Sequence, residues 1–390
     1  MTWFLSRLLH AAGYGAPATP QAPETTPDSP RPLRFGVLGA ANIAPFALIH
    51  PARFVGDRVV VTAVAARDAA RAAKFAASHG IPKSYGSYAA LLADPDIDAV
   101  YVPSPNGLHY AWVVRALEAG KHVLCEKPIA SNADEARAMV AAAEAAGRVV
   151  MEAAHCFHHP AMLRAREIVR SGELGAVERV EAVMEIPGFF IPSSDIRYNN
   201  AGTDAKLAGG ATMDVGSYVT NCVRFLADAE VASVVSAKAT ERFPGVDQAM
   251  EAELTFRDSR VTGGIVGTMT AGVSKGFWVN RARVRGANGT LTVSNYVMAG
   301  LFHRIDVDVA GKRRTEHVYG SPARSTYEHQ LIVFSDAVRA AAAAGGRGGA
   351  ARTTTGGVID DFVGCMEAID AVYEKSGLGR RVGYALDEVR

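Results

Sequence analysis

Residues suited to chemistry follow short apolar runs in the N-terminal half of the chain. The first such segment, residues 38–44, reads Leu-Gly-Ala-Ala-Asn-Ile-Ala. Small residues where a strand turns into a helix let backbone N–H groups approach a pyrophosphate. Gly39 is the only glycine at the three favoured positions, since Ala41 and Ala44 occupy the others, and an ordinary tight turn is the alternative. The predicted cofactor-binding residues here are Gly39, Ala40, Ala41, Asn42 and Ile43.

Arg67 lies at the end of the second predicted strand. An acidic residue at this position would bind the ribose hydroxyls of NAD. A guanidinium instead offers several donors that suit a ribose phosphate. The sequence therefore favours NADP over NAD, with a solvated arginine beside a helix-capping Asp68 as the alternative.

Two further loops follow predicted strands, residues 103–109 with Ser104, Asn106 and His109, and the run Glu126-Lys127-Pro128. Taken singly, each is weak evidence, because a histidine at a helix start is more often structural. Loops at the carboxyl ends of parallel strands share one edge of a sheet. We therefore expect both loops to line the cofactor cleft.

The predicted strands and helices that position these residues follow two different patterns along the chain. Strands are predicted near residues 34–38, 59–65, 99–102, 122–125 and 148–152, with helices between them, which indicates a parallel sheet covered on both faces. Asp68 as N-cap and Gly80 as C-cap delimit a helix at 69–79. After residue 152, strand-like runs follow one another with few helices, at 177–186, 231–240, 249–256, 261–269 and 278–285. This indicates an α+β domain with an antiparallel or mixed sheet.

The change in pattern also predicts the domain boundaries. We expect a tail at 1–33 and domains at 34–156 and 157–390.

Composition excludes several classes of protein. The chain has 390 residues, 41 Lys plus Arg and 40 Asp plus Glu, for a net charge of +1, so no strong field attracts nucleic acid or an anionic membrane. No apolar run approaches the roughly 18 residues of a membrane span. Four scattered cysteines without a C-x-x-C pair favour a reducing compartment. We expect a cytoplasmic protein with a small-molecule partner.

From about residue 34 to the C-terminus, the chain resembles the glucose–fructose oxidoreductase / inositol dehydrogenase / rhizopine catabolism (Gfo/Idh/MocA) family. The motifs that carry the resemblance are residues 39–44, 104–109, 125–128 and 209–218, the last reading Gly-Gly-Ala-Thr-Met-Asp-Val-Gly-Ser-Tyr. The resemblance implies an α/β protein with an N-terminal Rossmann domain and a C-terminal α+β domain whose open, mostly antiparallel sheet supports oligomerisation. It also implies NADP as cofactor and a dimer or higher homo-oligomer.

Tyr218 stands where many members of the family carry histidine. In this it resembles the branch containing dihydrodiol dehydrogenase, NADP-dependent D-xylose dehydrogenase and related sugar ketoreductases. Asp195-Ile196-Arg197-Tyr198 is also similar to that branch. The resemblance implies that His155 and Arg197 line the substrate pocket. We expect no metal, although residues 155–159 read His-Cys-Phe-His-His, because this segment links the two domains.

Hydride transfer from an alcohol needs a group that takes the hydroxyl proton. A free tyrosine has a pKa near 10 and is a weak base at neutral pH. Lys127, close to Tyr218 in the cleft, would favour the phenolate, and Asp214, four residues before Tyr218 on one helix face, could orient substrate hydroxyls. The alternatives are that Asp214 only caps the helix and that Tyr218 is a core residue. The predicted catalytic residues are Lys127, Tyr218 and Asp214, of which Asp214 and Tyr218 also contact substrate.

These inferences together predict NADP-dependent oxidation of an aldopyranose such as D-xylose to its lactone. A trans-dihydrodiol dehydrogenase is the close alternative, because residues 154–157 depart from the xylose dehydrogenase pattern. A non-catalytic NADP-binding sensor is a second alternative, since fold alone does not establish function.

Overall fold

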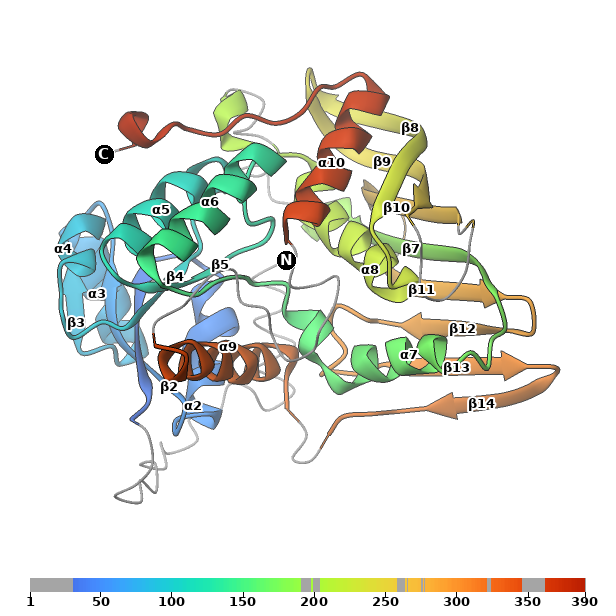
Figure 1. The fold of residues 1–390 in the computed structure, drawn as a ribbon. Helices are drawn as coiled ribbons and strands as arrows, with labels where there is room; N and C mark the ends of the chain where they lie inside the picture. The colour runs from blue at the N-terminus through green and yellow to red at the C-terminus, as the bar shows by residue number, and fades with distance from the viewer. Residues whose placement is uncertain are drawn as a thin grey trace.

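Two β-sheets with their helices lie side by side in the computed structural model (Figure 1). The structure describes residues 31–190, 198, 204–257, 264, 266–274, 276, 278–320, 324–345 and 362–389. Most of the predicted tail, residues 1–30, lies outside the described residues. No helix among the described residues is long and apolar enough to cross a membrane.

The first sheet has six parallel strands in the order β3-β2-β1-β4-β5-β6. This order starts in the middle and proceeds outward in both directions, so that a crevice opens between β1 and β4 at their carboxyl ends. The Rossmann prediction is therefore confirmed. The strands are β1 Leu33–Leu38, β2 Val59–Ala65, β3 Lys83–Tyr85, β4 Ala99–Val102, β5 His122–Cys125 and β6 Val150–Glu152. The helices are η2 Pro45–Ile49, α2 His50–Phe54, α3 Ala69–His79, α4 Tyr88–Leu92, η3 Asn106–Leu108, α5 His109–Glu118 and α6 Ala133–Ala146.

Apolar runs and capping residues within single elements determine the secondary structure of this half of the molecule. β2, β4 and β5 occupy the predicted ranges, because continuous apolar runs suit strands that are covered on both faces. Helix α3 begins after Asp68, whose side chain accepts hydrogen bonds from the Ala70 and Arg71 N–H groups, and ends at Gly80 in the left-handed conformation. Both caps are confirmed.

The second sheet has eight strands in the order β14-β13-β12-β11-β7-β10-β9-β8. Among the described strands of this sheet, only β7 and β10 pair in parallel, so the sheet is mostly antiparallel, as predicted. Its strands are β7 Val177–Pro187, β8 Val231–Phe243, β9 Val246–Phe256, β10 Val266–Ser274, β11 Val279–Gly286, β12 Gly289–Ser294, β13 Arg304–Val309 and β14 Lys312–Glu316. The associated helices are η4 His155–His158, α7 Pro160–Arg170, η5 Gly188–Phe190, η7 Ala205–Leu207, η8 Thr212–Gly216, α8 Ser217–Ala227, α10 Phe362–Ser376 and η9 Leu386–Glu388.

Helix α9, Thr326–Ala343, returns to the Rossmann domain. Its Leu331, Phe334 and Val338 are buried in the same core as Phe35 of β1, and the Phe334 and Phe35 ring centroids are 5.4 Å apart. Burying each such side chain contributes about 1.5–3 kcal/mol. The sequence analysis did not predict this helix. The packing places the N-terminus of α9 beside η4, where the site forms.

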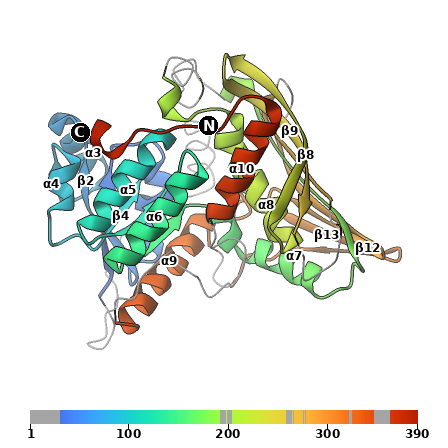
Figure 2. The same cartoon turned by 45° about the horizontal axis from the view of Figure 1, so that its top comes forward.

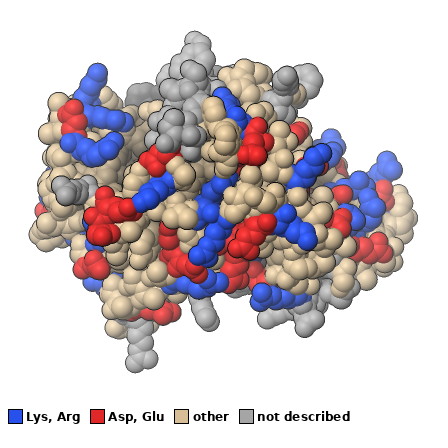
Figure 3. Space-filling model, turned by 90° about the horizontal axis from the view of Figure 1, so that it is seen from above, with Lys and Arg blue, Asp and Glu red and all other residues tan. Residues whose placement is uncertain are grey.

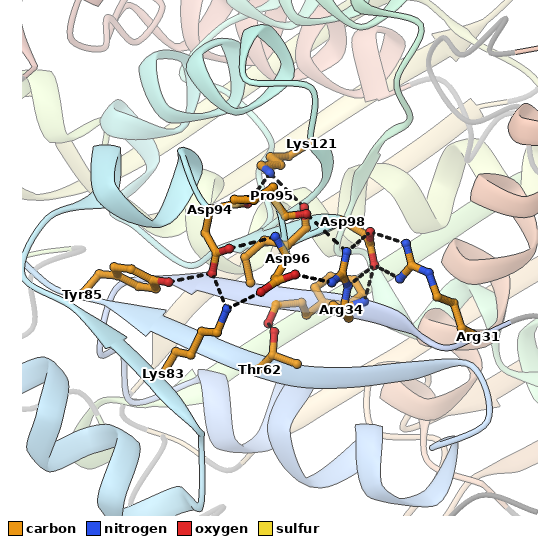
Figure 4. A network of polar contacts seen from close by, with 12 residues as sticks. Arg31, Arg34, Thr62, Lys83, Tyr85, Asp94, Pro95, Asp96, Asp98 and Lys121 are labelled. Atoms are coloured by element: carbon orange, nitrogen blue, oxygen red, sulfur yellow. Dashed lines mark hydrogen bonds and ion pairs between the residues drawn. The ribbon is translucent and has the colours of Figure 1, made fainter.

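A charged network closes the amino-terminal edge of the Rossmann sheet (Figure 4). Asp98 accepts hydrogen bonds from Arg31 at 2.6 Å and from the Arg34 backbone at 2.9 Å. The Lys121 ammonium donates to two backbone carbonyls nearby. This edge lies opposite the carboxyl ends of the strands, so we assign the network to stability.

Charge is evenly distributed over the face seen in Figure 3, where Lys and Arg side chains alternate with Asp and Glu. This mixture agrees with the net charge of +1. The described residues of this face form no continuous basic track for a phosphate backbone.

Candidate active site

A cavity of about 760 Å³ opens at the carboxyl ends of β1, β2 and β4. Cavities of about 300–1,000 Å³ are typical of small-molecule and cofactor sites. The structure thus brings three separate strand-end segments together, as the parallel sheet requires. The predicted residues that line this cavity are Gly39, Ala40, Ala41, Arg67 and Ser104.

The cavity walls fit a dinucleotide. Gly39 has a φ of 132°, which a side chain would strain, and a Cβ there would lie 3.4 Å from the Tyr88 hydroxyl. Backbone can therefore approach a phosphate at this turn. The Ser104 hydroxyl is buried and has no hydrogen-bond partner among the described residues, so it is available to a polar ligand.

Two arginines stand at the end of β2. Arg67 is exposed, and Arg71, one helical turn later, donates a hydrogen bond of 2.9 Å to the Ala40 carbonyl. Both line the cavity, where guanidinium groups suit a ribose phosphate. Arg71 was not among the predicted cofactor residues, although it lies only four residues after Arg67, in the first turn of α3.

The remaining predicted cofactor residues of these loops do not line the cavity in this structure. Asn42 is exposed, Ile43 packs against the core, and the Asn106 amide donates to the Ala208 carbonyl at 2.9 Å. The buried His109 ring lies between the Ser104 and Pro128 carbonyls, 2.8 Å from each. Burial lowers the pKa of His109 to about 4, so the ring is neutral and donates its single N–H to one of the two carbonyls. Cofactor contact by these residues stays a prediction.

Lys127, Asp214 and Tyr218 lie together between the two domains. The Lys127 ammonium donates to the Asp214 backbone carbonyl at 2.7 Å and pairs with its carboxylate at 3.0 Å. The same nitrogen lies 4.8 Å from the centroid of the Tyr218 ring. The second carboxylate oxygen of Asp214 accepts a hydrogen bond of 3.1 Å from Tyr198. The structure therefore brings the three predicted catalytic residues into contact.

Asp214 does not cap helix α8. It lies within η8, a π-helical turn, and α8 begins after Gly216 without a side-chain cap. Such wide turns occur frequently at functional sites. The Glu152 carboxylate at the end of β6 accepts a hydrogen bond of 3.1 Å from Asn221 of α8 and one of 3.0 Å from the Ile129 N–H, which follows β5. Glu152 therefore connects α8 to the Rossmann domain.

The Tyr218 hydroxyl forms one end of a buried chain of hydrogen bonds. It lies 3.0 Å from His155 Nε2, and His155 Nδ1 lies 2.8 Å from the Thr326 hydroxyl. Tyr327 stacks on the His155 ring with centroids 4.0 Å apart. Burial lowers the pKa of His155 to about 3, so the ring is neutral. No local signal in the sequence pointed to Thr326 or Tyr327.

The expectation that Lys127 favours the Tyr218 phenolate is wrong for this structure. Burial raises the pKa of Tyr218 well above its ordinary value. Lys127 faces the ring rather than the hydroxyl, and the carboxylate of Asp214 offsets its charge. Tyr218 is therefore a neutral hydroxyl that can donate a proton.

The other predicted residues have separate positions. The Glu126 carboxylate accepts a hydrogen bond of 2.5 Å from the Tyr101 hydroxyl, and Arg197 lies outside the described residues. In segment 155–159, Cys156 is buried in the core while His159 caps helix α7. The part of the chain that the structure describes contains no cluster of three side chains suited to a metal.

The comparisons with known proteins agree with this geometry. Residues 33–154 match an oxidoreductase family with an NAD-binding Rossmann fold, and residues 162–292 match the Gfo/Idh/MocA C-terminal domain. The chain is 36% identical over 354 residues to D-xylose 1-dehydrogenase (NADP(+)) 2 of Haloferax volcanii, which covers 90% of this chain and 99% of the relative. It is 33% identical over 257 residues to trans-1,2-dihydrobenzene-1,2-diol dehydrogenase of Bos taurus, with 66% and 72% of the two chains covered.

A solved structure is also similar over both domains. The crystal structure of a variant 3-ketoreductase from Actinomadura kijaniata, in complex with NADP and TDP-benzene, has a TM-score of 0.75 and 27% identity to this chain. The likeness covers 91% of this chain and 100% of that one. Both domains match the family and a relative aligns over 90% of this chain, so the chain belongs to the Gfo/Idh/MocA family of oxidoreductases.

Proposed function

We propose that this NADP-dependent oxidoreductase oxidises the anomeric hydroxyl of an aldopyranose such as D-xylose to the lactone. The observation that carries the proposal is the contact of Lys127 with both Asp214 and the Tyr218 ring. The similar xylose dehydrogenase supports the substrate class. NADP, when bound, accepts the hydride, and Arg67, Arg71 and the turn at Gly39 would hold it.

Tyr218 acts as the acid/base group through His155. A neutral phenol can take up the substrate's hydroxyl proton only if its own proton leaves, and His155 Nε2 at 3.0 Å accepts that proton. The Nδ1 proton of His155 then passes to the Thr326 hydroxyl, which releases its own proton to a water molecule. Thr326 also lines a cavity of about 40 Å³ between α2 and the start of α9, which is large enough for a water molecule.

Lys127 and Asp214 have complementary tasks. The Lys127 ammonium stabilises negative charge that develops on the reacting oxygen. The carboxylate of Asp214 is 2% exposed and is held by Lys127 and Tyr198, so it can accept hydrogen bonds from substrate hydroxyls in a fixed position. We propose that His155 and Arg197 contact the same substrate.

The test measures NADPH absorbance with purified protein, NADP and either D-xylose, D-glucose or a trans-dihydrodiol. The Tyr218→Phe variant should lose at least about a hundredfold in kcat, because general acid/base catalysis contributes about 10²–10⁴. The matched control is Tyr296→Phe, since Tyr296 is equally buried and its hydroxyl has no partner among the described residues. Xylose turnover that persists in Tyr218→Phe would refute the role of Tyr218.

A trans-dihydrodiol dehydrogenase is the second candidate, supported by the similar bovine enzyme. The same Tyr218 would then take the proton of a ring hydroxyl. Reduction of NADP by the dihydrodiol alone would select this function. Tight NADP binding without turnover of any compound would favour a non-catalytic sensor.

We also propose a homodimer or higher oligomer formed through the open face of the second sheet. On that face β11 exposes Arg281, Arg283 and Arg285, and Arg283 pairs across the sheet with Glu181 of β7. Rows of opposite charge can pair between two copies. Light scattering of Arg283→Glu against the wild type tests the assembly. All four cysteines are buried and no disulfide joins them, which supports a cytoplasmic location.

A further inference from the structure

The chain returns from α10 to the Rossmann domain in a C-terminal strap, which we define as residues 378–389. In Figures 1 and 2 this segment runs from the end of α10 across to the Rossmann side of the molecule. At its start, Arg381 pairs with the buried Asp247 at 3.1 Å. At its end, Arg115 of α5 donates to the carbonyls of Leu386 and Val389 at 2.7 and 2.5 Å. The strap is therefore fixed to both domains.

The middle of the strap contacts the turn at residues 204–207, which comes from the second domain. Tyr384 donates its hydroxyl to the Asp204 carboxylate, and Glu388 pairs with Lys206. The Tyr384 N–H donates to the Gly107 carbonyl at 2.8 Å. We call the Tyr384–Asp204 and Glu388–Lys206 contacts the clasp.

The turn and the cofactor loop touch through their backbones. A Cβ on Gly107 would lie 1.6 Å from the Lys206 carbonyl oxygen, so glycine is required there. The loop at 103–109, the turn and the strap thus form one continuous wall. Side chains distant in sequence are held together by this contact.

That wall faces the dinucleotide cavity. Asp204, Leu207, Tyr384, Glu388 and Val389 line it together with the Rossmann residues. Arg67 and Arg71 line the same cavity from the end of β2. A free carboxylate at Glu388 would repel phosphate, and the pair with Lys206 offsets its charge.

We propose that the C-terminal strap is part of the NADP site and that the clasp closes it over the cofactor. The inference rests on the proposed use of NADP. A cofactor that contacts the strap only when the clasp is formed must stabilise the clasp, and by linkage the clasp must strengthen cofactor binding to the same extent. The ion pair is half-exposed, with side-chain exposures of 43% and 38%, so we expect the Tyr384 hydrogen bond and the backbone contacts to dominate.

The first experiment titrates NADPH into the full chain and follows its fluorescence, which needs no turnover. A variant that ends at Gly383 and the full-length Tyr384→Phe/Glu388→Gln variant should each raise the Kd at least about fivefold. The reason is that apparent affinity falls with the fraction of molecules whose site is formed. The double variant keeps the anchors at Arg381 and Arg115 and so preserves the fold. Asp387→Asn is the matched control, because Asp387 is an exposed strap carboxylate that does not line the cavity.

The second experiment uses trypsin, which cleaves after the exposed Arg380 when the strap opens. Saturating NADP should slow release of the C-terminal fragment by about tenfold or more in the wild type. In the clasp double variant this protection should shrink.

A shortened chain that binds NADPH as tightly as the wild type, with no protection from trypsin, overturns the strap proposal while leaving the proposed function intact. A wild-type protein that does not bind NADPH at all overturns both. If NADPH binding weakens equally in Asp387→Asn and in the double variant, the strap proposal is also overturned. The weaker binding would then result from the changed charge of the strap and not from loss of the clasp.

Discussion

Replacing Thr326 with valine tests the proton route directly. Thr326, His155 and Tyr218 are 3%, 2% and 6% exposed, so bulk solvent does not reach their hydrogen bonds. Valine keeps the shape of threonine and removes the hydroxyl that lies 2.8 Å from His155 Nδ1. The imidazole is then left with a buried ring nitrogen that has no acceptor.

An unsatisfied buried polar group costs about 1–3 kcal/mol. If that cost falls on the proton transfer, kcat decreases about 5- to 150-fold, since about 1.4 kcal/mol corresponds to a factor of ten. The dissociation constant for NADP should not change, because Thr326 does not line the dinucleotide cavity. The assay is the initial rate of NADPH formation with the best substrate across pH 6–9, together with an NADPH fluorescence titration.

Two further variants distinguish the loss of the relay from a general effect of removing a buried hydroxyl. Thr326→Ser restores a hydroxyl and should recover most of the rate. Thr220→Val removes another buried threonine hydroxyl, whose sulfur contact with Met269 at 3.8 Å lies outside the relay, and should leave kcat unchanged. The reasoning is refuted if Thr326→Val retains kcat within about twofold of the wild type, because an intact relay would then not need this hydroxyl.

Three other perturbations give distinct outcomes. Arg67→Asp should raise the KM for NADP far more than the KM for NAD, and equal changes would contradict the assignment of the ribose phosphate to this arginine. Lys127→Met removes the ammonium group that pairs with the Asp214 carboxylate. The kcat should fall by at least about a hundredfold while circular dichroism stays native, and near-normal turnover would remove Lys127 from the mechanism. Burial alone would raise the pKa of Asp98, but hydrogen bonds from two arginines outweigh it and lower that pKa. This stabilisation is therefore present at neutral pH and lost as the pH falls through the lowered pKa. Asp98→Asn should cost about 1–3 kcal/mol in urea unfolding at pH 7, and this difference should begin to shrink as the pH falls below about 4, the ordinary pKa of an aspartate; a pH-independent difference would show that the carboxylate charge is not involved.

Short-range patterns were sufficient for the Rossmann half of the molecule. Strands β2, β4 and β5 and the caps of α3 follow from residues within one element. The parallel order places their loops at one edge, so Gly39, Arg67 and Ser104 could be assigned to one cavity before any coordinates. The motif at residues 209–218 likewise indicated Asp214 and Tyr218 through the family resemblance.

The packing of helix α9 could not be predicted from the sequence. Its apolar residues suit a helix, yet nothing local states that they pack against β1 of a distant domain. That packing places Thr326 next to His155 and thus completes the relay. The position of the strap was equally unpredictable from the sequence. Tyr384 and Glu388 are held by contacts with Asp204, Lys206 and the loop at Gly107, which are distant in sequence.

The charge state of Tyr218 was also decided by the tertiary structure. From the sequence, a nearby lysine predicts a lowered pKa, whereas burial raises it and Asp214 offsets the lysine. Periodicity and capping determine which segments become strands and helices, since these depend on neighbours along the chain. Hydrogen-bond partners, burial and the net field at a buried hydroxyl depend on segments far apart in sequence, and only the folded arrangement of both domains determined them here.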